Sequence, residues 1–230
     1  PNQVWAIDIH DPHKKVMTFN PKSGGLWGRT GAAVDSTGRV WAPTGDGVYI
    51  PEQHTYGNGL IGTKVVDGQL QLQDWFEPSN WAWLKKRDLD MQVTPSIFLF
   101  KNHELMVTGS KECRVYLLDT NSAGGDDHQT PLFRTPLMCN EEVNFASAGI
   151  WGSMASWEDS KDTRWVLTSF WGPVHPNFKV PVSYGPVTHG AIVAFKVEEQ
   201  GGKFSLNPAW MSRDMNRAEP PIVANGVVYA

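Results

Sequence analysis

The sequence predicts an all-β fold, on three observations. Short runs of β-branched and aromatic residues recur along the 230 residues and are bounded by Gly, Pro, Asn or Asp. The 22 glycines and 16 prolines are spread along the chain, as expected for many short elements joined by turns. Convincing helical periodicity is missing, and the best candidate, residues 81–87, predicts at most a short loop helix.

The strand signals follow one another at short intervals. Each combines a β-branched or aromatic run with flanking turn residues, so each predicts a strand of ordinary length. The predicted strands are residues 4–9, 38–43, 96–100, 105–109, 114–118, 164–169, 191–197 and 222–229.

One segment pattern occurs four times and predicts repeated sheets. In order along the chain, the pattern consists of an apolar residue, an Asp or Lys about two positions later, a turn, and an aromatic residue. Anchored on Ala6, Gly62, Leu117 and Ala194, its copies lie about 55, 55 and 77 residues apart, near the period of propeller or solenoid repeats. A Pro- and Gly-rich insertion around residues 171–188 accounts for the longest interval.

A predicted hairpin stands ahead of the anchor segment at residues 94–108 and again at 220–228. We therefore expect a β-propeller of four-stranded antiparallel blades, with a tryptophan at the end of each repeat packed between blades. Residues 1–230 are expected to form a single propeller region of about four blades, an incomplete part of a longer, eight-bladed ring. The alternative is a closed four-bladed ring, in which residues 4–9 complete the blade that 222–229 open.

Composition narrows the function classes. The formal net charge is −4 and no Lys- or Arg-rich run occurs, so the sequence predicts no nucleic-acid partner. No stretch approaches the roughly 18 apolar residues that span a bilayer, and no Gly-x-Ser-x-Gly, P-loop or His-Glu-x-x-His motif is present.

The histidines of residues 10–13 predict a polar turn. Cys113 and Cys139 lack metal-ligand spacing; we expect two buried thiols, with a structural disulfide as the alternative.

Four short motifs carry a family resemblance. They are Gly25-Leu26-Trp27-Gly28, Thr44-Gly45-Asp46-Gly47, Asp88-Leu89-Asp90 followed by Thr94-Pro95, and Gly109-Ser110-Lys111-Glu112. In this order and at this spacing they resemble the quinoprotein alcohol dehydrogenase superfamily, whose eight-bladed, quinoprotein-type propellers hold pyrroloquinoline quinone (PQQ). The resemblance covers nearly the whole chain and implies a periplasmic or secreted location.

The resemblance implies a role for each of five residues. Trp27 would form the floor beneath PQQ, and Lys111 would contact the oxygens of the quinone. Asp46, where the family usually has asparagine, and Asp90 would be metal ligands for a Ca or lanthanide ion. Asp88 would be the catalytic base. The residues taken locally allow other roles: turn capping for the three aspartates, packing between blades for Trp27 and an ordinary solvated charge for Lys111.

Two departures from the family pattern bear on activity. Arg87 precedes Asp88 where the family usually has tryptophan, and a guanidinium that points inward would make the carboxylate a weaker base. The vicinal cysteine pair of the alcohol dehydrogenases is absent. We therefore expect a non-catalytic or degenerate PQQ-like propeller that serves as a scaffold for a small-molecule ligand or a protein partner. The alternative is part of a PQQ-dependent dehydrogenase that oxidises an alcohol or a sugar.

Overall fold

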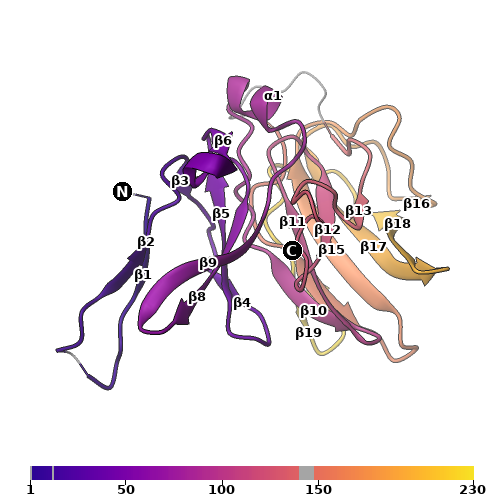
Figure 1. Ribbon diagram of the computed structural model, residues 1–230. Coiled ribbons are helices and arrows are strands. Elements are labelled where there is room, and N and C mark those ends of the chain that lie inside the picture. The colour runs from indigo at the N-terminus through magenta and orange to yellow at the C-terminus, as the bar shows by residue number, and fades with distance from the viewer. Residues whose placement is uncertain (1, 12, 140–147) are drawn as a thin grey trace.

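The computed structural model describes residues 2–11, 13–139 and 148–230. The fold is all-β, as predicted, and consists of several small, mainly antiparallel sheets that follow one another in chain order across the molecule (Figure 1). Among the described residues the helical elements are α1 (Trp81–Lys86) and the 3₁₀ turn η1 (Pro51–Gln53). Neither is long and apolar enough to cross a membrane.

Three sheets contain four or five strands each. The first has the order β3-β5-β8-β9, with β4 also paired to β5, and the second has the order β10-β11-β12-β13. The third has the order β14-β15-β17-β18, extended by β16, which is parallel to β18. The bounds are β3 Gly25–Leu26, β4 Ala33–Val34, β5 Val40–Gly45, β8 Leu60–Val66, β9 Gln69–Phe76, β10 Ser96–Phe100, β11 His103–Gly109, β12 Val115–Asp119, β13 Phe133–Arg134, β14 Ala155–Glu158, β15 Arg164–Trp171, β16 Val182–Ser183, β17 Gly190–Gln200 and β18 Lys203–Met211.

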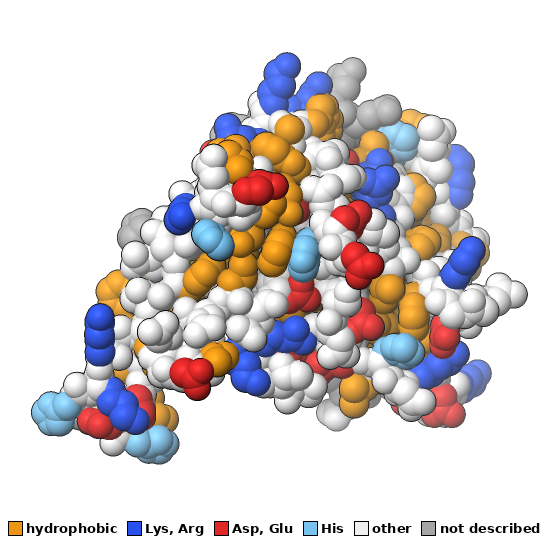
Figure 2. All heavy atoms as spheres, in the orientation of Figure 1, with side chains coloured by type: hydrophobic (Ala, Val, Ile, Leu, Met, Phe, Trp, Pro, Cys, Tyr) orange, Lys and Arg blue, Asp and Glu red, His pale blue; other side chains and the backbone are white. Residues whose placement is uncertain are grey.

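Three two-stranded sheets complete the fold. They pair β1 (Val4–Ala6) with β2 (Met17–Phe19), β6 (Tyr49–Ile50) with β7 (Thr55–Tyr56), and β19 (Ile222–Ala224) with β20 (Val227–Tyr229). The pairing of residues 4–9 with 222–229, required by a closed four-bladed ring, is not among the pairings of the described residues. The tip of the β1–β2 hairpin carries His, Lys and Asp side chains (Figure 2), and there the amide of His13 donates to the Asp11 side chain, as in the predicted polar turn.

Three of the four anchor residues occupy equivalent strands. Gly62 lies in β8, Leu117 in β12 and Ala194 in β17, each the third strand in its sheet's main run of four. The first and third sheets also share an irregularity, because the pairing register shifts between Gly62 and Thr63 and again between Ala194 and Phe195. Such a bulge adds one residue to one strand and increases its local twist. The repeat inferred from the sequence therefore corresponds to a repeat in strand order.

The second sheet is buried on both faces, which fixes the order of the layers. Along β11, Leu105 and Val107 belong to the large apolar cluster shared with the third sheet, whereas Met106 packs with Trp41 and Phe76 of the first. Successive side chains of a strand point to opposite faces, so one continuous apolar run serves two neighbours. This is why residues 105–107 show no polar alternation.

The two cysteines correct an expectation from the sequence. Cys113 and Cys139 are fully buried, as expected, but they are joined in a disulfide rather than present as free thiols. The two Cα atoms lie 5.7 Å apart because the Met138 amide donates a hydrogen bond to the Cys113 carbonyl oxygen. That backbone contact joins the loop after β11 to the segment after β13. Local sequence carries no sign of it.

Candidate ligand and metal site

The five residues singled out from the sequence lie on loops that meet at one place. Trp27 follows β3, Asp46 follows β5, Asp88 and Asp90 follow α1, and Lys111 follows β11. One carboxylate oxygen from each of Asp46, Asp88 and Asp90 lies within 4.8 Å of the others. The Lys111 ammonium is 5.8 Å from the centroid of the Trp27 ring. The predicted metal ligands, base, aromatic floor and basic contact are therefore neighbours.

Lys111 is buried, although a lysine in a loop is ordinarily solvated. Only 3% of the residue is exposed, and its ammonium forms an ion pair with Asp90 Oδ2. The same nitrogen donates to the carbonyl oxygen of Asp88 at 3.2 Å and lies 3.8 Å from that residue's Oδ1. The backbone supports this placement, since the Lys111 amide donates to the Asp90 carbonyl oxygen at 3.1 Å. The reading of Lys111 as an ordinary solvated charge is wrong.

Asp90 lies at the base of the cluster and is 1% exposed. Its Oδ2 faces Lys111, whereas its Oδ1 is buried and has no hydrogen-bond partner among the described residues. Burial raises the pKa of Asp90, the hydrogen bond and charge of Lys111 oppose that change, and the charges of Asp88 and Asp46 reinforce it. A buried carboxylate oxygen without a donor is unfavourable unless a cation or a proton satisfies it.

Backbone geometry brings the loops this close. Asp46 (φ 39°) and Asp88 (φ 55°) both have left-handed backbone conformations, which Asp tolerates better than most residues. Gly45 must be glycine, because a methyl group there would lie 2.5 Å from Trp27 Nε1 and 2.8 Å from Asp90 Cβ. The end of β5 therefore lies directly against both the indole and the buried side chain of Asp90.

The outer members of the cluster remain accessible to a ligand. Trp27 is 49% exposed, and its backbone amide is fixed by a hydrogen bond to the Pro43 carbonyl oxygen. The Asp88 side chain is 42% exposed. Arg87 does not turn inward beside it: this exposed guanidinium lies 5.0 Å from the centroid of the Trp83 ring. The condition under which Arg87 was expected to weaken Asp88 as a base is therefore not met.

Sequence reasoning missed one member of this neighbourhood. The Lys111 ammonium lies 5.1 Å from the centroid of Trp151, closer than to Trp27. Trp151 stacks on Trp171 with a centroid distance of 5.0 Å. A signal was available, because Gly149-Ile150-Trp151-Gly152 repeats the pattern Gly25-Leu26-Trp27-Gly28.

The chemistry open to this cluster follows from its charges. Three carboxylates face one ammonium, so the cluster has an excess of hard, negatively charged oxygen ligands. The partly exposed indole beside it offers an apolar, π-rich surface to a flat ligand, and Lys111 offers a positive charge to an oxygen of that ligand. No protein-family model matches the chain, and the comparison with curated proteins found no match.

Proposed function

We propose that this chain is part of a quinoprotein-type β-propeller whose cluster binds a hard cation, Ca²⁺ or a lanthanide ion, beside a planar quinone such as PQQ. The propeller is supported by three successive sheets whose main strands run antiparallel, and by the anchor residues in the third strand of each. Stacking such repeats buries both faces of an inner sheet, as in the second sheet here.

The observation that carries the cation site is the meeting of Asp46, Asp88 and Asp90 around a buried, unpartnered oxygen of Asp90. Hard cations take carboxylate oxygens as ligands, and a bound ion would satisfy Oδ1 while Lys111 stays paired to Oδ2. The two carboxylates left uncompensated by Lys111 suit a divalent or trivalent charge. These three residues therefore fit the ion that the resemblance implies.

The residues present also fit one face of a planar quinone. Trp27 would support the ring system and Lys111 would donate to a quinone oxygen, where a fixed positive charge favours the more negative, reduced form. When bound, PQQ supplies a hydride acceptor. The resemblance does not extend to the vicinal cysteine pair of the alcohol dehydrogenases, because the two cysteines of this chain form a buried structural disulfide. We therefore favour a ligand-binding propeller over an enzyme.

A second candidate, a PQQ-dependent dehydrogenase acting on alcohols or sugars, is favoured by one observation. Asp88 keeps a partly exposed carboxylate at the mouth of the cluster, and Arg87 lies against Trp83 instead of beside it. A carboxylate so placed is available to accept the proton of a substrate hydroxyl group. For either candidate, the Cys113–Cys139 disulfide supports a periplasmic or secreted location, since disulfides persist in oxidising compartments.

Terbium luminescence tests the cation site directly. Tb³⁺ is a hard cation, and excitation of Trp27 would sensitise its emission when the ion binds in the cluster. We expect saturable emission, a loss of affinity of at least about tenfold in Asp90→Asn, and unchanged affinity in the matched control Asp126→Asn, an exposed carboxylate outside the cluster. Equal affinities for the two variants would overturn the proposed site.

Quinone binding is tested separately. In the presence of Ca²⁺ or La³⁺, PQQ should quench the tryptophan fluorescence of the wild-type chain, and Lys111→Met should weaken that binding by removing the charge that faces the quinone oxygen. Trp27→Phe should reduce the terbium emission while leaving Tb³⁺ affinity, measured by competition with La³⁺, nearly unchanged. If the wild-type chain bound Tb³⁺ but not PQQ, the proposed cation site would stand and the proposed quinone site would be overturned.

A further inference from the structure

Trp27 and Trp151 are equivalent residues of an internal repeat. Residues 25–41 align without a gap to 149–165, and the strand register agrees, because Ala33 pairs with Trp41 as Trp157 pairs with Trp165. The turns that follow agree in detail as well: Trp41 Nε1 donates to Asp35, and Trp165 Nε1 donates to Asp159. The identical positions are Gly25/Gly149, Trp27/Trp151, Gly28/Gly152, Asp35/Asp159, Ser36/Ser160 and Trp41/Trp165.

The two equivalent indoles both approach one ammonium. Lys111 Nζ lies 5.8 Å from the centroid of Trp27 and 5.1 Å from that of Trp151, within the range in which the negative face of an aromatic ring attracts a cation. Lys111 comes from the second sheet, whereas the indoles come from loops of the first and third sheets. Residues from three sheets therefore meet at this nitrogen.

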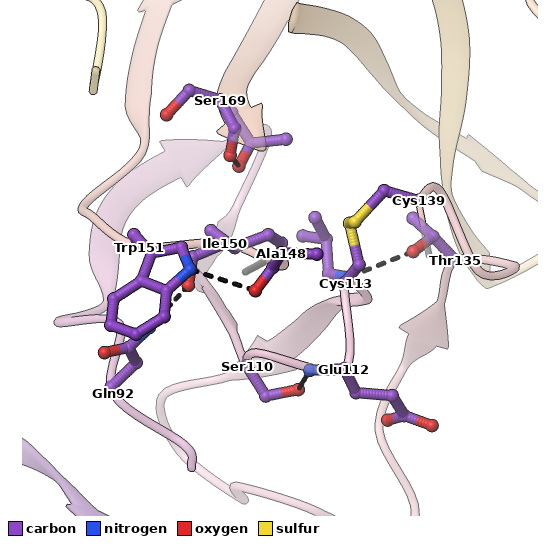
Figure 3. Close-up of a disulfide and its surroundings, with 12 residues drawn as sticks. Gln92, Ser110, Glu112, Cys113, Thr135, Cys139, Ala148, Ile150, Trp151 and Ser169 are labelled. Carbon is purple, nitrogen blue, oxygen red and sulfur yellow. Dashed lines mark hydrogen bonds between the residues drawn. A yellow bond between two sulfur atoms is a disulfide. The ribbon is translucent and has the colours of Figure 1, made fainter. Parts of the chain in front are cut away.

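The loop that carries Trp151 is held against the backbone of Lys111. A methyl group on Gly149 would collide with the Lys111 carbonyl oxygen and Cα, so only glycine permits this approach. The amide of Ile150 donates to the Ser110 carbonyl oxygen at 3.3 Å, and Gln92 Nε2 donates to the Ile150 carbonyl oxygen at 2.7 Å (Figure 3).

The Trp151 ring itself is also fixed. Its Nε1 donates to the Ala148 carbonyl oxygen at 2.9 Å (Figure 3). The stack on Trp171 supports the ring. Arg217 lies 5.5 Å from the centroid of Trp171, so a second cation accompanies the stacked pair. Because both its edge and its stacking partner are set, the ring has little freedom to move away from Lys111.

We propose that Trp151 is a positioning residue that, together with Trp27, holds the Lys111 ammonium in place against Asp90. The ion pair with Asp90 and the hydrogen bond to the Asp88 carbonyl oxygen hold the ammonium from the carboxylate side, and the two indoles add contacts from the first and third sheets. A cation that arrives at Asp46, Asp88 and Asp90 would repel this ammonium, and the two indoles oppose its displacement. The consequence for ligand binding rests on the proposed function, but the placement of Lys111 does not.

Acylation of lysine side chains, read by peptide mass spectrometry, tests this placement without metal or quinone. Wild-type Lys111 should be strongly protected. Trp151→Leu should raise its labelling rate by about tenfold and Trp151→Phe, which keeps an aromatic face, by less than about threefold. The matched control is Trp157→Leu, which removes one ring of the stacked Trp157–Trp165 pair in the same sheet. This control should leave Lys111 protected.

The outcomes decide between positioning and simple packing. Equal protection by Phe and Leu in a folded protein would mean that Trp151 only fills space, and the proposal would be overturned. Should Trp151→Leu fail to fold, the same Phe and Leu pair at half-exposed Trp27 provides the comparison, with the same order expected. In a Lys111→Met background, Trp151→Leu should have no further effect on PQQ binding. A labelling result that contradicts the role of Trp151 does not bear on the proposed cation site, which the terbium titration tests separately.

Discussion

The indole of Trp41 donates a hydrogen bond of 2.9 Å to the carboxylate of Asp35, six residues earlier, across the turn that joins β4 to β5. Burial opposes ionisation of this carboxylate. Hydrogen bonds from Thr37, Trp41 and the Arg39 backbone, together with the charge of Arg39, favour the ionised form more strongly than burial disfavours it. The pKa of Asp35 therefore falls to about 2. Arg39 Nε contacts the same carboxylate at 2.7 Å. The turn is thus organised around one ionised side chain.

Asp35→Asn should therefore destabilise the protein in a pH-dependent way. A folded-state pKa below the unfolded value adds stability that is present above about pH 4 and is lost as the pH falls towards about 2. We expect Asp35→Asn to lower the free energy of unfolding by about 2 kcal/mol at pH 7, from the size of the shift. Urea unfolding of both proteins between pH 7 and pH 2 measures this difference.

The internal repeat provides the control for that experiment. In the turn before β15, Asp159 accepts hydrogen bonds from the Thr163 amide and from Trp165 Nε1, as Asp35 does from the Arg39 amide and Trp41 Nε1. Thr163 stands where Arg39 does, so the ion pair is not repeated, and Asp159 is more exposed than Asp35. Its pKa is also lowered, chiefly by the hydrogen bond from Trp165. Asp159→Asn should cost less stability than Asp35→Asn, because solvent screens the exposed carboxylate. If the loss of unfolding free energy relative to wild type were independent of pH in both variants, the role assigned to ionised Asp35 would be contradicted.

Reduction of the Cys113–Cys139 disulfide should destabilise the fold. The bridge joins residues 26 apart, and a loop of that length corresponds to about 3 kcal/mol of unfolding free energy in the chain-entropy description. Urea unfolding of the Cys113→Ser, Cys139→Ser double variant against wild type measures it. Because Cys113 lies two residues from Lys111, the double variant should also label faster at that lysine. Unchanged stability of the double variant would contradict this expectation, because a cross-link restricts the unfolded chain whatever other contacts hold the folded one.

Gly45→Ala should disturb the site more than the fold. The added methyl group would meet the indole of Trp27 and the Cβ of Asp90, so both must shift. Overpacking of this kind costs about 1–3 kcal/mol of stability, and the displaced carboxylate should bind Tb³⁺ more weakly. Gly25→Ala is the milder variant for comparison, since its methyl group would lie 3.1 Å from Trp27 Nε1, against 2.5 Å for Gly45→Ala. Terbium titration and thermal unfolding of both variants should show the larger effects at Gly45.

We expect the chain, supplied with PQQ and Ca²⁺ or La³⁺, to bind the quinone without oxidising simple alcohols. Trp27 supplies one face for a flat ligand, and one face orients such a ligand poorly for a reaction that requires close alignment. The measurement is reduction of an artificial electron-accepting dye. Turnover that disappears in Asp88→Asn would establish the dehydrogenase in place of the ligand-binding propeller.

Much of the strand pattern could be predicted because β propensity and turn residues act locally. Residues 96–100 were predicted as a strand with the bounds that β10 has, and the short helix at 81–87 is α1. Where ends differ, the partner strand decides: β17 continues to Gln200 because Gln200 pairs with Lys203 across a hairpin turn, beyond the predicted end at 197. Polar strand ends of that kind carry no hydrophobic signal.

The composition of the site could be predicted, but its burial could not. Asp46, Asp88 and Asp90 were found through motif order, yet nothing near Lys111 in the sequence indicates that Trp27 and Trp151 enclose it. The disulfide was only the alternative expectation for the same reason, since its two halves meet only through tertiary packing. Trp151 was missed because the repeat was sought through strands spaced about 55 residues apart. Residues 25–41 and 149–165 are 124 positions apart, more than twice that spacing.

The loop that carries Trp27 is tied to parts of the chain made much later in synthesis. Arg29 pairs with Glu219 at 2.9 Å, and the Thr30 hydroxyl group contacts that of Ser153, at sequence separations of 190 and 123 residues. As the chain leaves the ribosome, the strands of the first sheet can pair early, whereas this loop gains these two contacts only after the third sheet and the segment that follows it have been made. The cluster around Lys111 takes residues from loops of all three larger sheets, so it is complete only after the segment that carries Trp151 has been made.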